Sequence, residues 1–284
     1  MDPEGAWEFR DDRGRLATAP RRPAKVVAYI QPGAALWDHG IRPAGLFGSA
    51  HDGAAPDPAK AGTLPLDDIP YFGSGAALDE AALLAADPDL VIAVTYDGDG
   101  VYGIDADAAK RLEARVPLVA LDVSGRRPLT ATRERLTALA HALGAATPAA
   151  AEAEVGDAER LLRAAAEAPG APRALALSPA GEDLVHLARP GSWPDLAAVA
   201  GLGVALCEPP PGAGLNWATT DWPTAAALNA PLWLVDARAN AAPLPAHLAA
   251  GIRVLPWNPE LPPSPRAHAH FHRTLAEALR AAAD

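Results

Sequence analysis

The sequence lacks three features that would each define a class of protein: paired cysteines, a long apolar run and a dense run of basic residues. Its one cysteine, Cys207, excludes an internal disulfide, and the apolar residues 204–206 before it predict a buried, unreactive thiol. Because no run of about eighteen apolar residues exists, no membrane span is predicted. A formal net charge of -11 without a cluster of Lys and Arg excludes a nucleic-acid binder.

Signals for export and for catalysis are also missing. Residues 1–15 are polar and charged, with no apolar signal core and no lipid-attachment cysteine. Two expectations stay open: a cytoplasmic protein, or an exported protein whose export segment is absent from the given chain. The motifs HExxH, GxSxG and CxxC and a phosphate loop ending in Lys-Ser/Thr are absent, so no catalytic residue, cofactor or metal ligand is predicted.

What is present is an alternation of short apolar runs with helical stretches. The first half begins with an expected hairpin around the turn at residues 11–14, and residues 49–70, rich in Pro, Asp, Gly and Ala, are expected to form a surface loop. Strands are predicted over 25–30, 46–48, 90–95 and 117–121, and helices over 34–38, 76–86, 106–115 and 130–143.

The alternation resumes in the second half after a long helical stretch. Strands are predicted over 173–177, 183–187, 204–207, 232–235 and 252–255, and helices over 193–200, 224–228 and 265–283. Alternating elements imply a mostly parallel sheet with helices on both faces. The sequence therefore predicts two Rossmann-like α/β lobes: an N-terminal lobe over 1–146, a connecting helix over 147–169 and a C-terminal lobe over 170–284.

Several segments, in this order and spacing, resemble the class III substrate-binding proteins of ferric-siderophore and cobalamin importers. They are DDRGR at 11–15 with PAKVVA at 23–28, ALWDHGIRPAG at 35–45, LLAADPDLVI at 83–92 and RPGSW at 189–193. The resemblance implies a monomeric, extracytoplasmic, membrane-associated protein with a ligand cleft between its lobes. Its partners would be an iron chelate or corrinoid and an ABC permease.

The resemblance also implies a surface Glu on each lobe that docks with the permease. The corresponding positions fall on Ala81, beside Glu80, and on Asp221, so both depart from the family pattern. Asp221 has a second interpretation, as a helix N-cap ahead of Pro223. Docking through Glu80 and Asp221 is therefore an expectation with a structural alternative.

Candidate ligand-binding residues follow the rule that ligands bind beyond the carboxyl ends of the strands of an open α/β sheet. Aromatic faces can bury the rim of a bulky chelate, and guanidinium groups can pair with its anionic oxygens. Large aromatic residues also fill cores, which is the competing interpretation for Trp193 and Trp217 and the preferred one for Trp233. The candidates are Tyr96, Tyr102, Arg189, Trp193, Trp217, Arg238 and Trp257.

Two further patterns favour other functions more weakly. Residues 98–103 match GxGxxG after a predicted strand, but Asp97, Asp99 and Asp105 place negative charge where a pyrophosphate would bind. The spacing of His268, His270 and His272 puts the first and third on one helix face, yet the zinc ligand set is incomplete, which favours a solvated helix start.

The favoured hypothesis is a non-catalytic substrate-binding protein for a ferric siderophore or similar chelate. The alternatives are a cytoplasmic protein that reuses the fold as an enzyme or metallophore-handling protein, and a binder of metal ions or cobalamin.

Overall fold

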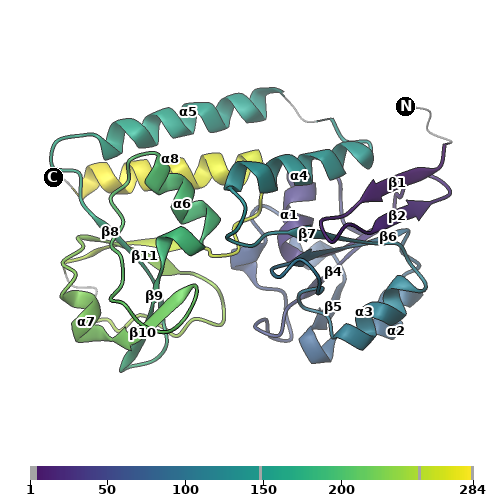
Figure 1. Ribbon diagram of the computed structural model, residues 1–284, viewed down its shortest axis with the longest axis horizontal. Coiled ribbons are helices and arrows are strands. Elements are labelled where there is room, and N and C mark those ends of the chain that lie inside the picture. Colours follow the sequence, from purple (N-terminus) through teal and green to yellow (C-terminus); the bar gives the residue numbers. More distant parts are fainter. Residues whose placement is uncertain (1–4, 147–148, 249–250, 283–284) are drawn as a thin grey trace. The chain divides into compact units, whose positions relative to one another are not determined.

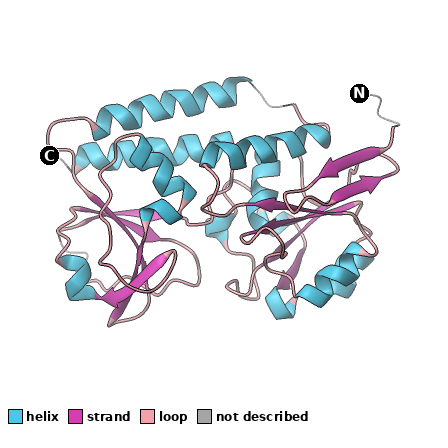
Figure 2. Ribbon diagram, viewed as in Figure 1, coloured by secondary structure: helices cyan, strands magenta, loops and turns pink. Residues whose placement is uncertain are grey.

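A computed structural model describes residues 5–146, 149–248 and 251–282, and the chain forms two compact units (Figures 1 and 2). Unit 1 comprises Met1–Ala149 with Pro262–Ala267, and unit 2 comprises Ala150–Leu261 with His268–Asp284. Each unit contains one five-stranded sheet with helices packed against it. The predicted fold class, two α/β lobes with mostly parallel sheets, is confirmed.

The sheet of unit 1 is entirely parallel, with strand order β5-β4-β3-β6-β7. One face packs against α1, α4 and the hairpin β1–β2, and the other packs against α2 and α3. The strands are β1 (Trp7–Arg10), β2 (Leu16–Ala19), β3 (Val26–Tyr29), β4 (Gly45–Gly48), β5 (Tyr71–Ser74), β6 (Leu90–Thr95) and β7 (Leu118–Asp122). The helices are α1 (Ile30–Asp38), α2 (Glu80–Ala85), α3 (Ala106–Glu113) and α4 (Leu129–Ala142).

The predicted N-terminal hairpin protects the open edge of this sheet. Its turn lies against edge strand β7, where Asp12 N donates to the Ala120 carbonyl at 3.0 Å. The carboxylates of Asp11 and Asp12 accept from the backbone N–H groups of Ala120 and Asp122. Unpaired N–H groups at a sheet edge can pair with another chain, and these two carboxylates prevent this by accepting hydrogen bonds from the edge strand.

Two predictions in unit 1 are wrong for identifiable reasons. The segment 49–70 is more than a surface loop: it contains two 3-10 turns, and Asp52 and Lys60 are buried in it as an ion pair. The α1 helix begins at Ile30, earlier than expected, because Pro32 lies in its first turn, where the missing N–H costs nothing. Strand β5 was not anticipated at all, since its four residues include Gly73.

The sheet of unit 2 is mixed, with strand order β10-β9-β8-β11-β12. β8, β11 and β12 are parallel, whereas β9 is antiparallel to both neighbours. Residues 219–221, for which no strand was predicted, belong to β10 and pair with β9. The strands are β8 (Ala174–Pro179), β9 (Leu184–Ala188), β10 (Trp217–Asp221), β11 (Leu232–Asp236) and β12 (Arg253–Trp257), and residues 204–207 contribute only an isolated bridge.

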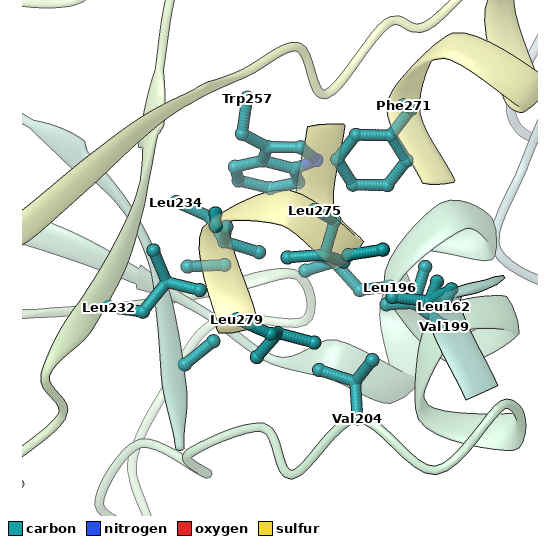
Figure 3. Close-up of a cluster of buried hydrophobic side chains, with 14 of the residues drawn as sticks. Leu162, Leu196, Val199, Val204, Leu232, Leu234, Trp257, Phe271, Leu275 and Leu279 are labelled. Carbon is teal, nitrogen blue, oxygen red and sulfur yellow. The ribbon is translucent and has the colours of Figure 1, made fainter. Parts of the chain in front are cut away.

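The larger core of unit 2 lies between its sheet and three helices. α5 (Ala149–Ala166), α6 (Pro194–Gly201) and α8 (Pro265–Ala281) supply Leu162, Leu196 and Leu275 to it (Figure 3). The short α7 (Trp222–Ala226) packs on the opposite face, where Trp233 and Cys207 are buried as predicted. The helix predicted over 147–169 corresponds to α5; residues 147–148 lie outside the described residues.

Candidate functional site

In unit 1, aromatic rings gather where the parallel strands end. Tyr29 ends β3 and Phe47 lies on β4, with ring centroids 5.8 Å apart. Tyr102 packs edge-on against Tyr29 at 5.8 Å and against Tyr96 at 4.8 Å. Tyr29 is fully buried, whereas Tyr96 and Tyr102 are half-buried. The two tyrosines predicted from sequence as ligand-binding are thus neighbours at the carboxyl edge of the sheet.

The loop between β6 and α3 contains these two tyrosines, and its backbone N–H groups bind the carboxylate of Asp97, a residue of the same loop. The Asp97 carboxylate accepts hydrogen bonds from the backbone N–H groups of Asp99 and Gly100 and from the Thr95 hydroxyl. These bonds lower the pKa of Asp97 to about 2. Gly103 has a φ of +81°, and a Cβ there would lie 2.8 Å from the Gly48 carbonyl oxygen. The glycine pattern therefore shapes a loop already occupied by a carboxylate, which argues against pyrophosphate binding.

An exposed arginine completes this edge of unit 1. Arg126 follows β7, and its Nη2 donates to the Tyr96 carbonyl at 3.3 Å while its Nε donates to the Ser124 hydroxyl at 3.3 Å. Reasoning from sequence missed this residue, although it follows a parallel strand and the strand-end rule applies to it. The guanidinium is thus held at the backbone of Tyr96, whose ring packs against Tyr102.

Beneath the tyrosines of unit 1 lies a buried ion pair. Lys60 Nζ is 2.8 Å from Asp52 Oδ1, and both side chains are inaccessible to solvent. The same Nζ is 3.3 Å from the Tyr29 hydroxyl, and Asp52 Oδ2 accepts from the Ser49 backbone N–H at 2.6 Å. A buried charge is tolerated only with such partners, so the pair fixes the 49–62 segment and Tyr29 together.

In unit 2, three predicted ligand-binding tryptophans form one cluster. Ring centroids of Trp193 and Trp217 are 4.9 Å apart, and Trp257 lies 5.6 Å from Trp193 and 5.9 Å from Trp217. Ala188 pairs with Trp217 across the strands, and its small side chain leaves room for the indole rings. Trp193 and Trp257 are buried and Trp217 is half-buried, so only Trp217 offers an accessible ring surface.

Arg189 holds a loop beside this cluster. Its Nε and Nη2 donate at 3.0 Å each to the carbonyls of Gly214 and Gly212, and its backbone N–H donates to the Asn216 carbonyl. The loop displays Leu215, whose side chain is 84% exposed. Reasoning from sequence missed this leucine, because an isolated leucine two residues before Trp217 carries no signal.

Arg238 has a different environment from the one expected. Its guanidinium pairs with Asp236 at 2.8 Å and Glu260 at 3.1 Å, and its side chain is 11% exposed. Burial by itself lowers the pKa of Arg238, but the hydrogen bonds and charges of the two carboxylates raise it well above the ordinary value. The positive charge of Arg238 is therefore already neutralised within the protein.

A buried acid underlies the tryptophan cluster. Asp195, in the first turn of α6, accepts a hydrogen bond from Trp257 Nε1 at 2.5 Å. Burial raises the pKa of Asp195 to about 6, against the lowering effect of the Trp257 bond and of nearby backbone N–H groups. No residue type or spacing in the sequence distinguished this aspartate from an ordinary first-turn acid.

The two residues expected to dock with a permease have local partners. Glu80 receives Arg111 Nε and Nη2 in a two-point ion pair, at 3.0 and 2.8 Å to Oε2. Asp221 caps α7, where its carboxylate accepts from the Thr224 N–H at 2.9 Å and the pKa of Asp221 is lowered by bonds to Thr224. Asp221 stays exposed, so the cap and an intermolecular contact are compatible.

Metal and membrane interactions leave no signature in the described part of the chain. Within residues 5–146, 149–248 and 251–282, no group of three His, Cys, Asp or Glu side chains is placed to hold a metal ion. His268 and His272 are buried in α8, so the predicted solvated helix start is wrong for them; His270 is exposed. Over the same residues, no helix has both the length and the apolar character needed to cross a bilayer.

The whole chain matches solved structures of binding proteins. It is similar to DesE, a ferric-siderophore receptor protein from Streptomyces coelicolor, with a TM-score of 0.85 and 28% identity over 96% of this chain and 98% of that chain. A siderophore periplasmic binding protein from the fuscachelin gene cluster of Thermobifida fusca gives a TM-score of 0.66 and 18% identity, covering 91% of this chain and 97% of that chain.

A haem-binding relative has the same fold. The periplasmic heme-binding protein RhuT from Roseiflexus sp. RS-1 gives a TM-score of 0.62 and 17% identity, covering 92% of this chain and 99% of that chain. No family model and no curated protein matches the sequence. The fold expected from the sequence resemblance is confirmed.

Proposed function

We propose, from the class III substrate-binding protein fold of this chain, that it captures a ferric siderophore or a chelate of similar chemistry for an ABC permease. The observation that carries the proposal is the match to a ferric-siderophore receptor over 96% of this chain. The other structural neighbours named above are also binding proteins, which supports a function without catalysis.

The side chains at the strand ends suit such a ligand. Unit 1 offers the half-buried rings of Tyr96 and Tyr102 beside Arg126, and unit 2 offers Trp217 and Leu215 beside Arg189. The aromatic and aliphatic surfaces bury the apolar part of a chelate, and the guanidinium groups pair with its carboxylate, hydroxamate or catecholate oxygens. Trp193 and Trp257 contribute by supporting Trp217, since they are buried themselves.

Delivery to a permease places the protein outside the cytoplasm. Of the two expected docking residues, Asp221 is the better candidate, because it is exposed and Glu80 is engaged by Arg111. Replacing Asp221 with Ala is expected to leave chelate affinity unchanged and to reduce uptake in cells that carry the matching permease.

Tryptophan-quenching titration tests the binding role directly. Purified full-length protein is titrated with a ferric trihydroxamate siderophore, a ferric tricatecholate siderophore, cobalamin, haemin and free Fe³⁺. Saturable sub-micromolar quenching by one ferric siderophore supports the proposal; tight binding of haemin or cobalamin alone would reassign the ligand, and no binding by any probe would overturn the proposal.

Matched variants separate specific binding from general quenching. Arg189→Ala and Arg126→Ala are expected to weaken binding, whereas Arg163→Ala and Arg115→Ala remove exposed arginines from other parts of each unit and are expected to have no effect. Equal weakening by all four variants would indicate a non-specific charge effect and contradict the assigned sites.

A further inference from the structure

We infer that Asp195 is a positioning residue whose buried carboxylate fixes the indole of Trp257 and, through it, the orientation of the ligand-facing Trp217. The inference rests on the proposed function, because Trp217 matters only if a ligand contacts it.

The carboxylate of Asp195 has an unusual set of partners. The residue is 4% exposed, and within the described residues its side chain is hydrogen-bonded by one other side chain, Trp257, with no cation paired to it. Trp257 is likewise buried among apolar residues, beside Phe271 (Figure 3). A carboxylate buried without a counter-ion costs folding free energy, whereas a neutral amide of the same shape could accept the Trp257 N–H without that charge. Stability therefore does not explain why an acid is present at this site.

Geometry connects the acid to the accessible surface in two steps. The short 2.5 Å hydrogen bond fixes the rotation of the Trp257 ring, which also packs against the apolar residues of the core. Trp257 then packs edge-on against Trp193 and Trp217, the second of which is half-buried. Trp193 is anchored separately, since its Nε1 donates to the Asn216 carbonyl at 3.1 Å. Trp217 is thus held between two fixed indoles, one of which depends on Asp195.

Ionisation of Asp195 is expected to change how firmly the Trp257 ring is held. A charged acceptor binds the Trp257 N–H more strongly than a neutral carboxyl does, so the ring is held most firmly above pH 6. Other titratable or charged groups on elements packed near Trp257 are the buried Asp236 and Glu260, which both pair with the half-buried Arg238, and the buried His268 and His272 of α8. A variant at Asp195 itself is therefore needed to assign any pH response.

The first experiment uses the unliganded full-length protein. Near-ultraviolet circular dichroism and tryptophan fluorescence are followed from pH 4.5 to 8 for the wild type, Asp195→Asn and the exposed-acid control Glu167→Gln. A transition near pH 6 is expected in the wild type and the control and is expected to be absent in Asp195→Asn. Absence of the transition from the wild type, or its persistence in Asp195→Asn, overturns the inference.

The second experiment measures affinity for whichever ferric siderophore probe the wild type binds. The wild type is expected to bind 3- to 10-fold more weakly at pH 5 than at pH 7.5, and Asp195→Asn is expected to show the weaker value at both pH values. Asp195→Leu, which offers no acceptor, is expected to lose 5- to 20-fold at pH 7.5. Unchanged affinity in both variants would sink the inference alone, since wild-type binding would still support the proposed function.

A double-mutant cycle tests whether Asp195 acts through Trp217. In the Trp217→Ala background, Asp195→Leu is expected to change affinity less than 2-fold, because the ring that it positions is gone. Full additivity of the two losses would assign Asp195 a separate effect and contradict the inference. If the wild type binds none of the probes, the proposed function fails and Asp195 is reduced to a structural residue, which overturns the inference as well.

Discussion

Each of the two units has a buried acid close to the aromatic residues at its strand ends, and the two acids differ in their side-chain partners. In unit 1, Asp52 lies beneath the tyrosines and is paired with Lys60, with 2.8 Å between the charged atoms. In unit 2, Asp195 lies beneath the tryptophans and has an indole N–H in place of a cation. One fold therefore holds a buried carboxylate either in an ion pair with a lysine or with an indole N–H as its side-chain partner.

The largest expected effect comes from breaking the pair in unit 1. Lys60→Met leaves the Asp52 carboxylate buried without its counter-ion, which is expected to lower the free energy of unfolding by about 3–5 kcal/mol. Urea unfolding of the full chain measures the change. Lys110→Met is the matched control, because its ion pair with Asp107 is exposed on both sides and is worth at most about 1 kcal/mol. Similar losses in both variants would contradict the structural role assigned to the buried pair.

Removing the charge of Asp195 in unit 2 is expected to raise the free energy of unfolding, whereas breaking the ion pair in unit 1 is expected to lower it. Burial raises the pKa of Asp195 in the folded state above its ordinary value, to about 6, so its contribution to stability is present at low pH and is lost as pH rises through 6. Asp195→Asn is therefore expected to be more stable than the wild type by up to about 3 kcal/mol at pH 7.5, from about 1.4 kcal/mol per pKa unit, and equally stable near pH 4. Urea unfolding at both pH values checks this, and a variant less stable at pH 7.5 would contradict it.

The arginines of the two sites are expected to matter less than the buried acids. Arg189→Ala removes one anion-pairing group and frees the loop that carries Leu215, so a loss of about 10-fold in chelate affinity is expected, or about 1.4 kcal/mol. Arg126→Ala removes a guanidinium that makes one hydrogen bond of 3.3 Å to a loop carbonyl, against two of 3.0 Å for Arg189, and a smaller loss is expected. Titration of both variants at pH 7.5 compares how much the arginine of each unit contributes to chelate affinity. A larger loss for Arg126→Ala would contradict the expected order.

The smallest expected effect concerns the cap of α7. Asp221→Ala removes the acceptor for the Thr224 N–H and is expected to lower the melting temperature slightly, with chelate affinity unchanged. Thermal unfolding measures the first quantity and quenching titration the second. Asp221→Asn, which keeps a capping oxygen, is the control that is expected to restore stability; if it does not, the loss does not come from the cap.

Local patterns in the sequence were sufficient for much of the fold. The run over 90–95 is β6 as predicted, because six consecutive apolar or β-branched residues suit a strand buried on both faces. The α3 helix begins at residue 106 as predicted, since Asp105 caps it through bonds to residues only two and three positions away. Strand β10 was missed because its partner β9 lies elsewhere in the chain. The buried pair of Asp52 and Lys60 was missed because Tyr29, which packs against it, lies 31 residues before Lys60.

Some properties of the candidate site were also predictable from the sequence, whereas others depended on the tertiary structure. The strand-end rule placed Tyr96 and Tyr102 at one edge of the sheet of unit 1, where their rings are in contact, because the carboxyl edge of a parallel sheet follows from the order of the elements. Their role in ligand binding stays a prediction. Which tryptophan is accessible, which arginine is already neutralised and which aspartate is buried depended on the tertiary structure. Those properties are set by neighbours that are distant in sequence: Glu260 lies 22 residues from Arg238 and Trp257 lies 62 residues from Asp195. The sequence by itself determined the class of fold and the chemistry available at its edge, and only three-dimensional packing decided which charges are compensated.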